Sequence, residues 1–288
     1  ARPLRVAVLG LGLIGGSIGL AARRRAGARV SGWDPHTEAR ARALELGAVD
    51  EIAPDLARAV ADADAVFVAA PVGVIAQTVQ AALQSAGAET VVTDVGSTKR
   101  AIVESISDPR FLGGHPLAGL EAAGVEHARE DLFEQAIWYL SVAGDAPGDA
   151  YERLHRLIVS FGAKPVPLDA DTHDRLMASV SHLPHVLANL LVAQVAAAQR
   201  DQGEPSALPG TLGIGPSFRD ATRVAGSNSE IWTDIYISNR EALVQAIDEL
   251  TGRLARVRSD LQAGDASAVR DWNERARVEH ETLLRPGS

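Results

Sequence analysis

A glycine-rich turn near the N-terminus constrains the fold of this chain more than any other feature. Residues 5–10 form a β-rich run, a G-x-G-x-x-G pattern follows, and a helix-like segment extends from Ser17 to Arg25. In this pattern the first glycine permits a tight turn, the second lets a pyrophosphate approach, and the third lets helix and strand pack closely. The helix N-terminus adds amides and a positive dipole end. The pattern predicts a dinucleotide site that includes Gly10, Gly12, Leu13, Ile14 and Gly15.

An acidic residue follows the second strand-like run, residues 28–33. Asp34 lies 19 residues beyond Gly15, close to the spacing at which a carboxylate binds the ribose of a dinucleotide. A carboxylate there accepts hydrogen bonds from both ribose hydroxyls and repels a 2′-phosphate, so the sequence favours NAD over NADP as the cofactor. His36 and Arg40 stand nearby and keep NADP open, and a simple turn acid is the structural alternative for Asp34.

Short apolar runs alternate with helical segments over the first part of the chain. The helix-like stretches lie at 39–46, 74–83, 99–107 and 151–160, and the later apolar runs at 65–70, 90–95, 111–114 and 137–142. Such alternation is typical of an α/β fold with a mostly parallel sheet and helices on both faces. We therefore predict a doubly wound, Rossmann-type NAD-binding domain over residues 1–168.

The pattern becomes helical in the second part of the chain. Residues 172 to about 198 and 229–284 show helical periodicity without a strand-like run, and a loop rich in Gly and Pro separates them at 203–216. Residues 186–193 are apolar on nearly every helical face, and such helices are buried. We expect residues 169–288 to form an all-helical substrate-binding and dimerisation domain, with a homodimer as the oligomer.

Charge and composition narrow the range of partners. The 37 acidic and 28 basic side chains give a formal net charge of −9, which disfavours nucleic acid or an anionic membrane. The chain has no cysteine, so disulfides and thiolate metal sites are excluded. We find no signal peptide and no apolar stretch of membrane-spanning length, and we expect a cytoplasmic protein. An anionic small substrate would then need locally placed arginines.

Three groups of residues follow strand-like runs and should meet at one edge of the sheet. Ligands of open parallel sheets bind beyond the carboxyl ends of the strands. His115, held between a glycine pair and a proline, is the candidate catalytic base at this edge. Ser97 is placed to orient it and Lys99 to approach an anion; a helix cap and a solvated charge are the structural alternatives. Two further residues at this edge are expected to contact the cofactor, Pro71 and Val72.

The helical part carries a second set of polar residues. His173 and His185 lie on one side of a helix if that helix runs unbroken. We expect no metal site, because no carboxylate pair or third histidine stands at ligand spacing. Arg219 and Arg223 are four residues apart and share a helical face if this segment is helical. Two arginines there could hold carboxylates bidentately, and surface ion pairs are the alternative.

Five motifs taken together resemble the prephenate and arogenate dehydrogenases of tyrosine biosynthesis. They are the glycine turn and residues 93–99, 114–119, 181–185 and 218–223, in the same order and over nearly the whole chain. The resemblance implies a Rossmann domain followed by a helical dimerisation domain, with NAD as cofactor. It also implies oxidative decarboxylation of a cyclohexadienol to a phenol, either prephenate to 4-hydroxyphenylpyruvate or arogenate to tyrosine.

The resemblance also assigns roles to single residues. His115 matches the catalytic histidine of the family, Ser97 its hydrogen-bonding partner, and Arg223 the arginine that binds a substrate carboxylate. Further matches to residues in or near the substrate pocket are Glu121, His173, His185 and Trp232. Two positions depart from the family pattern: Leu120, where many members have Thr or Ser, and Ser229, which replaces a usual proline.

Other functions remain open from the sequence. Hydroxyacid dehydrogenases and imine reductases share the domain order, but they commonly use a lysine or aspartate of the helical part, and both lysines here precede residue 168. A relative that acts on an amino analogue of prephenate is a closer alternative. A non-enzymatic NAD-sensing module would explain the glycine turn and the helices, but not the polar motifs.

Overall fold

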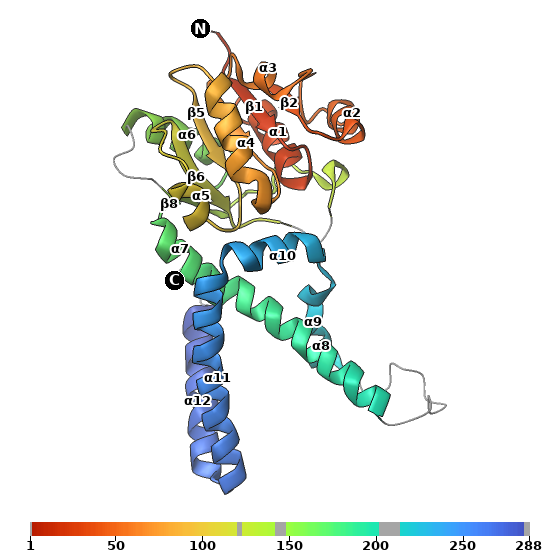
Figure 1. Cartoon of the computed structure of the whole chain (residues 1–288), viewed down its shortest axis with the longest axis vertical. Coiled ribbons are helices and arrows are strands. Elements are labelled where there is room, and N and C mark those ends of the chain that lie inside the picture. The colour runs from red at the N-terminus through yellow and green to blue at the C-terminus, as the bar shows by residue number, and fades with distance from the viewer. Residues whose placement is uncertain (1, 120–122, 142–147, 202–213, 285–288) are drawn as a thin grey trace. The chain divides into compact units, whose positions relative to one another are not determined.

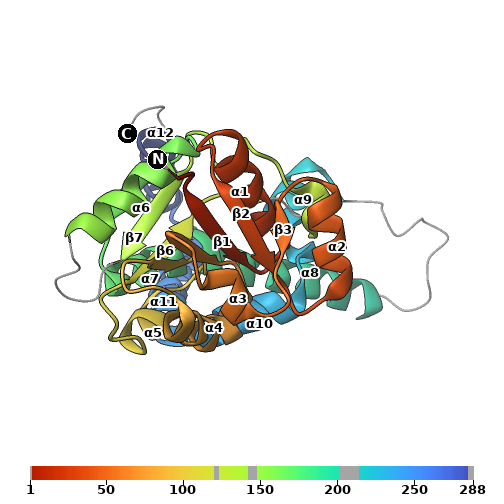
Figure 2. The ribbon, with the colours of Figure 1, turned by 90° about the horizontal axis from the view of Figure 1, so that it is seen from above.

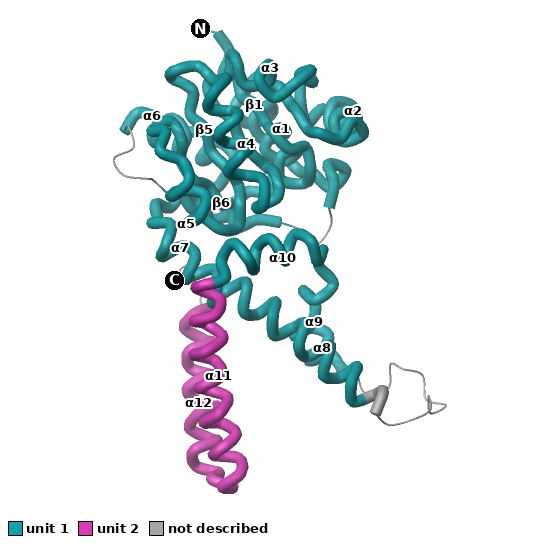
Figure 3. The backbone as a smooth tube through the Cα atoms, viewed as in Figure 1, with its two compact units in different colours: residues 1–240 teal, residues 241–288 magenta. Residues whose placement is uncertain are grey.

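The computed structural model describes residues 2–119, 123–141, 148–201 and 214–284. The described residues fall into two compact units, one within residues 1–240 and one within residues 241–288 (Figure 3). The first unit holds an eight-stranded sheet and the helices around it, and the second is a pair of helices (Figure 1). The sequence-based domain boundary at residue 168 stays a prediction, since these compact units divide elsewhere.

The sheet has the strand order β3-β2-β1-β4-β5-β6-β7-β8. The first six strands are parallel, β7 is antiparallel to β6, and β8 is parallel to β7. This is the mostly parallel sheet that the alternating pattern predicted. The strands are β1 (Arg5–Leu9), β2 (Arg29–Trp33), β3 (Glu51–Ile52), β4 (Ala65–Val68), β5 (Val91–Asp94), β6 (Phe111–Pro116), β7 (Ile137–Ser141) and β8 (Lys164–Pro167).

Helices cover both faces of the sheet (Figure 2). One face packs against α1 (Leu13–Arg24), α2 (Thr37–Glu45) and α6 (Gly148–Ser160), and the other against α3 (Leu56–Val60), α4 (Val72–Ser85) and α5 (Arg100–Glu104). The first face is filled by an aromatic cluster of Phe67, Phe133, Trp138 and Phe161. Large rings bury much apolar area, so this cluster anchors the antiparallel end of the sheet.

Three of these elements were not predicted. β3 has two residues and α3 five, which is too short for a clear period. β8 contains Pro165 and Pro167, and proline argues against a strand. It is tolerated here because β8 lies at the edge of the sheet, where one side of the strand needs no ladder hydrogen bonds.

A long helical segment follows β8 and lies below the α/β part in Figure 1. It comprises α7 (Ala170–Met177), a π-helical turn (Ala178–His182) and α8 (Leu183–Asp201). Proline has no N–H to donate, so the normal i to i−4 bond is missing at Pro184, next to the wider turn. Such π turns occur frequently at functional sites. The segment continues in α9 (Pro216–Thr222), a 3₁₀ turn (Arg223–Gly226) and α10 (Ser229–Ser238).

The second unit contains α11 (Arg240–Ala263) and α12 (Ala266–Leu283). Gly264 joins them in the left-handed region, with φ of +65°, which suits a residue without a Cβ. Asp265 then caps α12, because its carboxylate accepts the backbone N–H groups of Ser267 and Ala268. A tight reversal between two long helices results.

One sequence-based expectation about apolar stretches is wrong. Among the described residues, the segment Ala170–Ala198 is long and apolar enough to cross a membrane by length and composition. The helix predicted for residues 172 to about 198 is present, and the π turn keeps it continuous past Pro184. Its polar residues His173, Asp174 and His182 are buried within the first unit, and 28% of its apolar window is buried. An apolar face of this helix is therefore left exposed in the single chain.

Candidate active site

The glycine turn has the geometry that a dinucleotide requires. Gly10 adopts a φ of +97°, and a Cβ on Gly15 would lie 1.8 Å from the carbonyl oxygen of Gly10. Both positions therefore exclude a side chain. A Cβ on Gly12, in contrast, meets nothing within 4 Å, so the space beside the turn is open. The N-terminus of α1 begins at Leu13 beside this space, and these residues fit a pyrophosphate.

Asp34 lies at the carboxyl end of β2 and is 8% exposed. Its carboxylate accepts a hydrogen bond from the backbone N–H of Leu11 at 2.8 Å, and another from the backbone N–H of His36 at 2.8 Å. The side chain therefore fixes the glycine turn. This structural role adds to the two sequence-based interpretations of Asp34, a ribose ligand and a turn acid.

Pro71 is the N-cap of α4 and Val72 begins that helix, both at the same edge of the sheet as Asp34.

His115 is the penultimate residue of β6 and pairs with Tyr139 of β7. It thus lies at the carboxyl edge, as predicted. A Cβ on Gly114 would lie 2.4 Å from the backbone oxygen of Asp94, so the glycine lets β6 approach the end of β5. The Nδ1 atom of His115 lies 2.8 Å from Nε2 of His173 on α7. The structure therefore joins a strand-end histidine to a histidine 58 residues away.

Asp174 holds His173 in place. Its Oδ1 atom accepts hydrogen bonds from Nδ1 of His173 at 2.8 Å and from the backbone N–H of Lys99 at 2.7 Å. Its Oδ2 atom accepts the backbone N–H of Arg100 at 3.0 Å. The carboxylate thus binds the N-terminal turn of α5, where a negative charge is stabilised. Sequence reasoning missed Asp174, and its only local signal was its place next to His173.

Lys99 and Asp94 form an ion pair with both side chains 0% exposed. The Asp94 carboxylate also accepts the backbone N–H groups of Gly96 and Gly114, at 2.8 and 3.0 Å. Burial lowers the pKa of the Lys99 ammonium, and the charge of Asp94 opposes that shift. Both sequence-based readings of Lys99, a solvated charge and a group that approaches an anion, are wrong because Asp94 binds the ammonium in the core.

The surroundings of His115 favour the neutral ring. Burial lowers the pKa of the His115 imidazole well below its ordinary value, because an imidazolium there loses its hydration. Electrostatic interactions with three neighbours also disfavour the His115 imidazolium: His173, Lys99 and His182. A histidine that stays neutral at physiological pH is available to accept a proton.

A second cluster lies where the π turn and α8 meet α10. His185 stacks on Trp232 with ring centroids 3.6 Å apart and an interplanar angle of 6°, and its Nδ1 atom is hydrogen-bonded with the Tyr236 hydroxyl. Nε2 of His185 is buried with no hydrogen-bond partner among the described residues. His182 packs edge-on against Trp232, and its Nδ1 atom lies 3.1 Å from the amide nitrogen of Asn239. The sequence analysis identified His185 and Trp232 as site residues but not Tyr236, His182 and Asn239.

Other predicted site residues lie apart from these contacts. Ser97 is half-buried in the loop after β5, but the hydrogen bond of the His115 ring goes to His173 rather than to this serine. The shared helical face of Arg219 and Arg223 is not formed, because α9 ends at Thr222 and a 3₁₀ turn begins at Arg223. Both arginines are exposed, on segments that pack against α8. Two predicted positions, Leu120 and Glu121, lie outside the described residues.

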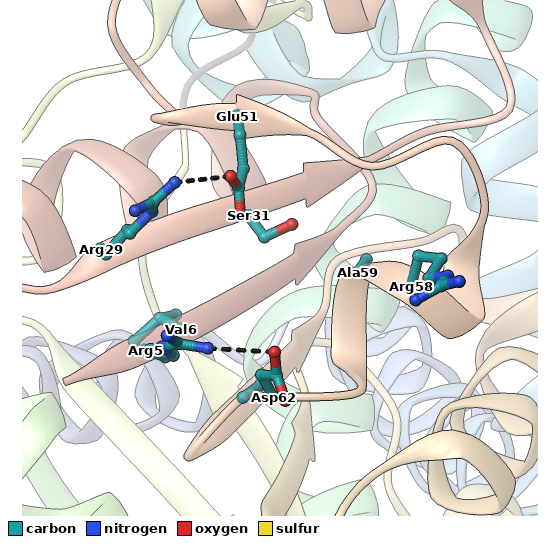
Figure 4. Close-up of a pocket in the computed structure, with 9 residues that line it drawn as sticks. Arg5, Val6, Arg29, Ser31, Glu51, Arg58, Ala59 and Asp62 are labelled. Atoms are coloured by element: carbon teal, nitrogen blue, oxygen red, sulfur yellow. Dashed lines mark hydrogen bonds and ion pairs between the residues drawn. The ribbon is translucent and has the colours of Figure 1, made fainter.

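A separate hollow lies at the opposite edge of the sheet, near the amino ends of β1 and β2 (Figure 4). It has a volume of about 170 Å³ and is lined by three arginines and two acids among other residues. Two of the arginines are paired, Arg5 with Asp62 at 3.0 Å and Arg29 with Glu51 at 2.8 Å. The hollow is therefore separate from the carboxyl edge, where the glycine turn, Asp34 and His115 lie.

Comparison with known proteins identifies relatives over most of the chain. Residues 18–166 match the family model for the nucleotide-binding domain of prephenate dehydrogenase, and residues 169–273 match the model for its dimerization domain. Prephenate dehydrogenase of Bacillus subtilis (strain 168) is 33% identical over 268 residues, which are 91% of this chain and 71% of that protein. Cyclohexadienyl dehydrogenase of Zymomonas mobilis is 32% identical, over 90% of this chain and 89% of that protein.

Solved structures give the same result. Prephenate dehydrogenase from A. aeolicus, in complex with hydroxyphenyl propionate and NAD⁺, superposes with a TM-score of 0.89 at 26% identity, over 98% of this chain and 99% of that one. Arogenate dehydrogenase of Synechocystis superposes with a TM-score of 0.82 at 25% identity, over 98% and 100%. The glycine turn and its neighbours therefore define an NAD-dependent dehydrogenase of the Rossmann type. The chain belongs to the prephenate dehydrogenase family, and the predicted family, fold class and cofactor are confirmed.

Proposed function

We propose that the protein catalyses the NAD-dependent oxidative decarboxylation of prephenate to 4-hydroxyphenylpyruvate. The observation that carries this proposal is the position of His115, half-buried at the carboxyl edge of the sheet that also carries the glycine turn, with its Nδ1 atom 2.8 Å from Nε2 of His173 and a pKa well below the ordinary value. Arogenate, which differs by an amino in place of a keto group on the side chain, would react by the same chemistry to give tyrosine. Relatives named for each substrate support the shared chemistry.

NAD supplies the hydride acceptor when it is bound. The ring of His115 accepts the proton of the substrate hydroxyl as the C–H bond of the carbinol carbon breaks, which prevents positive charge from building on that oxygen. The ring carboxylate then leaves as CO₂, and its bonding electrons complete the aromatic ring. His115 returns the proton to the phenol oxygen, so the products are the phenol, CO₂ and NADH. Neutral His115 is therefore regenerated in each turnover.

Roles follow for the remaining site residues. We assign the pyrophosphate to Gly10, Gly12, Leu13, Ile14 and Gly15, the ribose to Asp34, and the nicotinamide end to Pro71 and Val72. Ser97, predicted from the sequence as the hydrogen-bonding partner of His115, is kept as a proposed active-site residue at the same edge of the sheet. Arg223, with Arg219, is the proposed anchor for a substrate carboxylate, and Glu121, His185 and Trp232 are proposed to surround the substrate. His173, expected from the sequence in this group, is 0% exposed and contacts His115 instead.

We also propose that the protein is a homodimer. The face of α8 that lies exposed in one chain carries Leu190, Leu191 and Val192, with exposed fractions of 59%, 41% and 40%. A second copy would cover this apolar face, which supports the dimerization role given by the family model. Sedimentation equilibrium should give twice the chain mass of 30.3 kDa, and a monomer at micromolar concentration would contradict the proposal. The cytoplasmic location and the lack of nucleic-acid or membrane partners stay predictions from the sequence.

One assay tests the reaction directly. NADH or NADPH formation is measured with prephenate and with arogenate, each with NAD and with NADP. We expect turnover with NAD and prephenate. The variant His115→Asn should lower kcat by roughly 10²- to 10⁴-fold and leave NAD affinity unchanged, because it removes a general base and no cofactor contact. Near-normal turnover of the variant would refute the role of His115, and NAD binding without turnover of either substrate would favour the sensing module.

A second variant tests the substrate anchor. Arg223→Ala should raise KM for the substrate and leave NAD binding unchanged, since the arginine is assigned to a substrate carboxylate. Arg219→Ala is the matched variant, because Arg219 lies four residues before Arg223 and is also exposed, but on α9 rather than in the 3₁₀ turn. If KM changes for Arg219→Ala and not for Arg223→Ala, the anchor is Arg219.

A further inference from the structure

The contacts around His115 bear on which of its two nitrogens carries the proton. A base must present a lone pair to the substrate, and a neutral imidazole has one donor and one acceptor nitrogen. The nitrogen that is hydrogen-bonded within the protein therefore decides which nitrogen is left for the substrate. In this structure that bonded nitrogen is Nδ1, because its partner is Nε2 of His173 at 2.8 Å.

The direction of this hydrogen bond follows from Asp174. A carboxylate can only accept, so Nδ1 of His173 must donate its proton to Oδ1 of Asp174, 2.8 Å away. In a neutral His173 the other nitrogen, Nε2, then carries the lone pair. Nδ1 of His115 must be the donor to that lone pair, and Nε2 of His115 is left as the acceptor.

Asp174 is itself held in one orientation, and this fixes the direction of the hydrogen bonds from His115 to His173 and from His173 to Asp174. Its two oxygens accept the backbone N–H groups of Lys99 and Arg100, at 2.7 and 3.0 Å, and the residue is 3% exposed. His173 is 0% exposed, so no water competes for its ring. Buried groups of this kind hold a donor or acceptor in one orientation, because leaving it unpaired is costly.

We propose that His173 and Asp174 are positioning residues that fix the tautomer of His115, with the proton on Nδ1 and the lone pair of Nε2 facing the substrate. This inference rests on the proposed function, in which His115 is the base. It replaces the serine expected from sequence with a histidine and an aspartate as the groups that orient the base. The arrangement resembles in logic the buried carboxylate that sets the tautomer of a catalytic histidine in serine proteases.

Three variants separate tautomer control from packing. His173→Leu removes the acceptor for Nδ1 of His115. His173→Gln can restore it, since the side-chain oxygen of Gln can accept near the position of Nε2. Tyr139→Phe is the control, because Tyr139 packs edge-on against the His173 ring at 5.6 Å between centroids and the ring is kept.

The tautomer is read from two-bond ¹H–¹⁵N correlation spectra of protein labelled at histidine, with the His115 signals assigned by their loss in His115→Asn. We expect the proton on Nδ1 in the wild type, in Tyr139→Phe and in His173→Gln, and a shift of protonation to Nε2 in His173→Leu. In turnover, His173→Leu should lower kcat by about tenfold or more, up to the roughly 10²- to 10⁴-fold effect of a general base, with KM and NAD affinity unchanged. His173→Gln should recover most of that loss.

Two results would overturn the inference: Nε2 protonation of His115 in the wild type, or wild-type kcat and tautomer in His173→Leu. Loss of kcat in Tyr139→Phe equal to that in His173→Leu would assign the effect to packing and also overturn it. Failure of the proposed function is distinguishable, because the spectra report the tautomer even if neither prephenate nor arogenate is turned over.

Discussion

The pH dependence of stability offers a quantitative test of how the helical segment is buried. His182 lies in the π turn, is 1% exposed, and has a pKa lowered from 6.5 to about 4. Burial is the main cause; Asp174 opposes it, and the charges of His173 and His185 add to it. In the unfolded chain the same ring titrates near its ordinary value, about 6.5.

Proton linkage gives the sign and the size of the change in unfolding free energy that His182 causes as the pH falls. Between the two pKa values the unfolded chain binds a proton at His182 and the native chain does not, so this residue destabilises the fold as the pH falls. Its contribution is absent above about pH 6.5, grows through the window down to about pH 4, and is complete below that. At about 1.4 kcal/mol per pKa unit, lowering the pH from 7.5 to 5 removes about 2 kcal/mol of unfolding free energy through His182.

The assay is urea unfolding at pH 7.5 and pH 5, at one fixed protein concentration because association would also stabilise the fold. His182→Asn removes the titrating ring but keeps an oxygen that can accept the Asn239 amide. Its loss of stability between the two pH values should be about 2 kcal/mol smaller than that of the wild type. Met177→Ala, at a residue 2% exposed, is the cavity control and should keep the wild-type difference.

Wild-type pH dependence in His182→Asn would refute the reasoning. It would mean that the native ring is protonated at pH 5 much as the unfolded one is, and therefore that the π turn is hydrated rather than packed. A reduced pH dependence in Met177→Ala would also contradict it, because that variant changes packing and removes no titrating group.

Two further predictions concern the glycine turn and the buried ion pair. Gly15→Ala should lower the Tm and abolish NAD binding in calorimetric titration, because its Cβ would lie 1.8 Å from a backbone oxygen, whereas Gly12→Ala should keep the Tm and lose NAD affinity alone. Equal Tm values for both variants would contradict this. Lys99→Met leaves Asp94 buried and unpaired and should cost about 3–5 kcal/mol in unfolding free energy. A cost under ~1 kcal/mol would show that the pair is hydrated.

The sequence by itself determined the local features of this protein. The glycine turn, Asp34 and the alternation of strands and helices depend on neighbouring residues and their period, which a single sequence displays directly. The position of His115 at a strand end followed from the same pattern. The order of five motifs was enough to identify the family, later confirmed by its two domain models.

Only the tertiary structure decided what surrounds the base. Ser97 was the expected partner of His115, but His173, 58 residues away, takes that place and Asp174 fixes it. The sequence suggested that Lys99 is a surface charge or an anion-binding group, but in the structure its ammonium pairs with Asp94 in the core. The physical reason is that pKa values and hydrogen-bond direction depend on burial and on partners from distant segments. Both arise only when the helical segment packs over the carboxyl edge of the sheet.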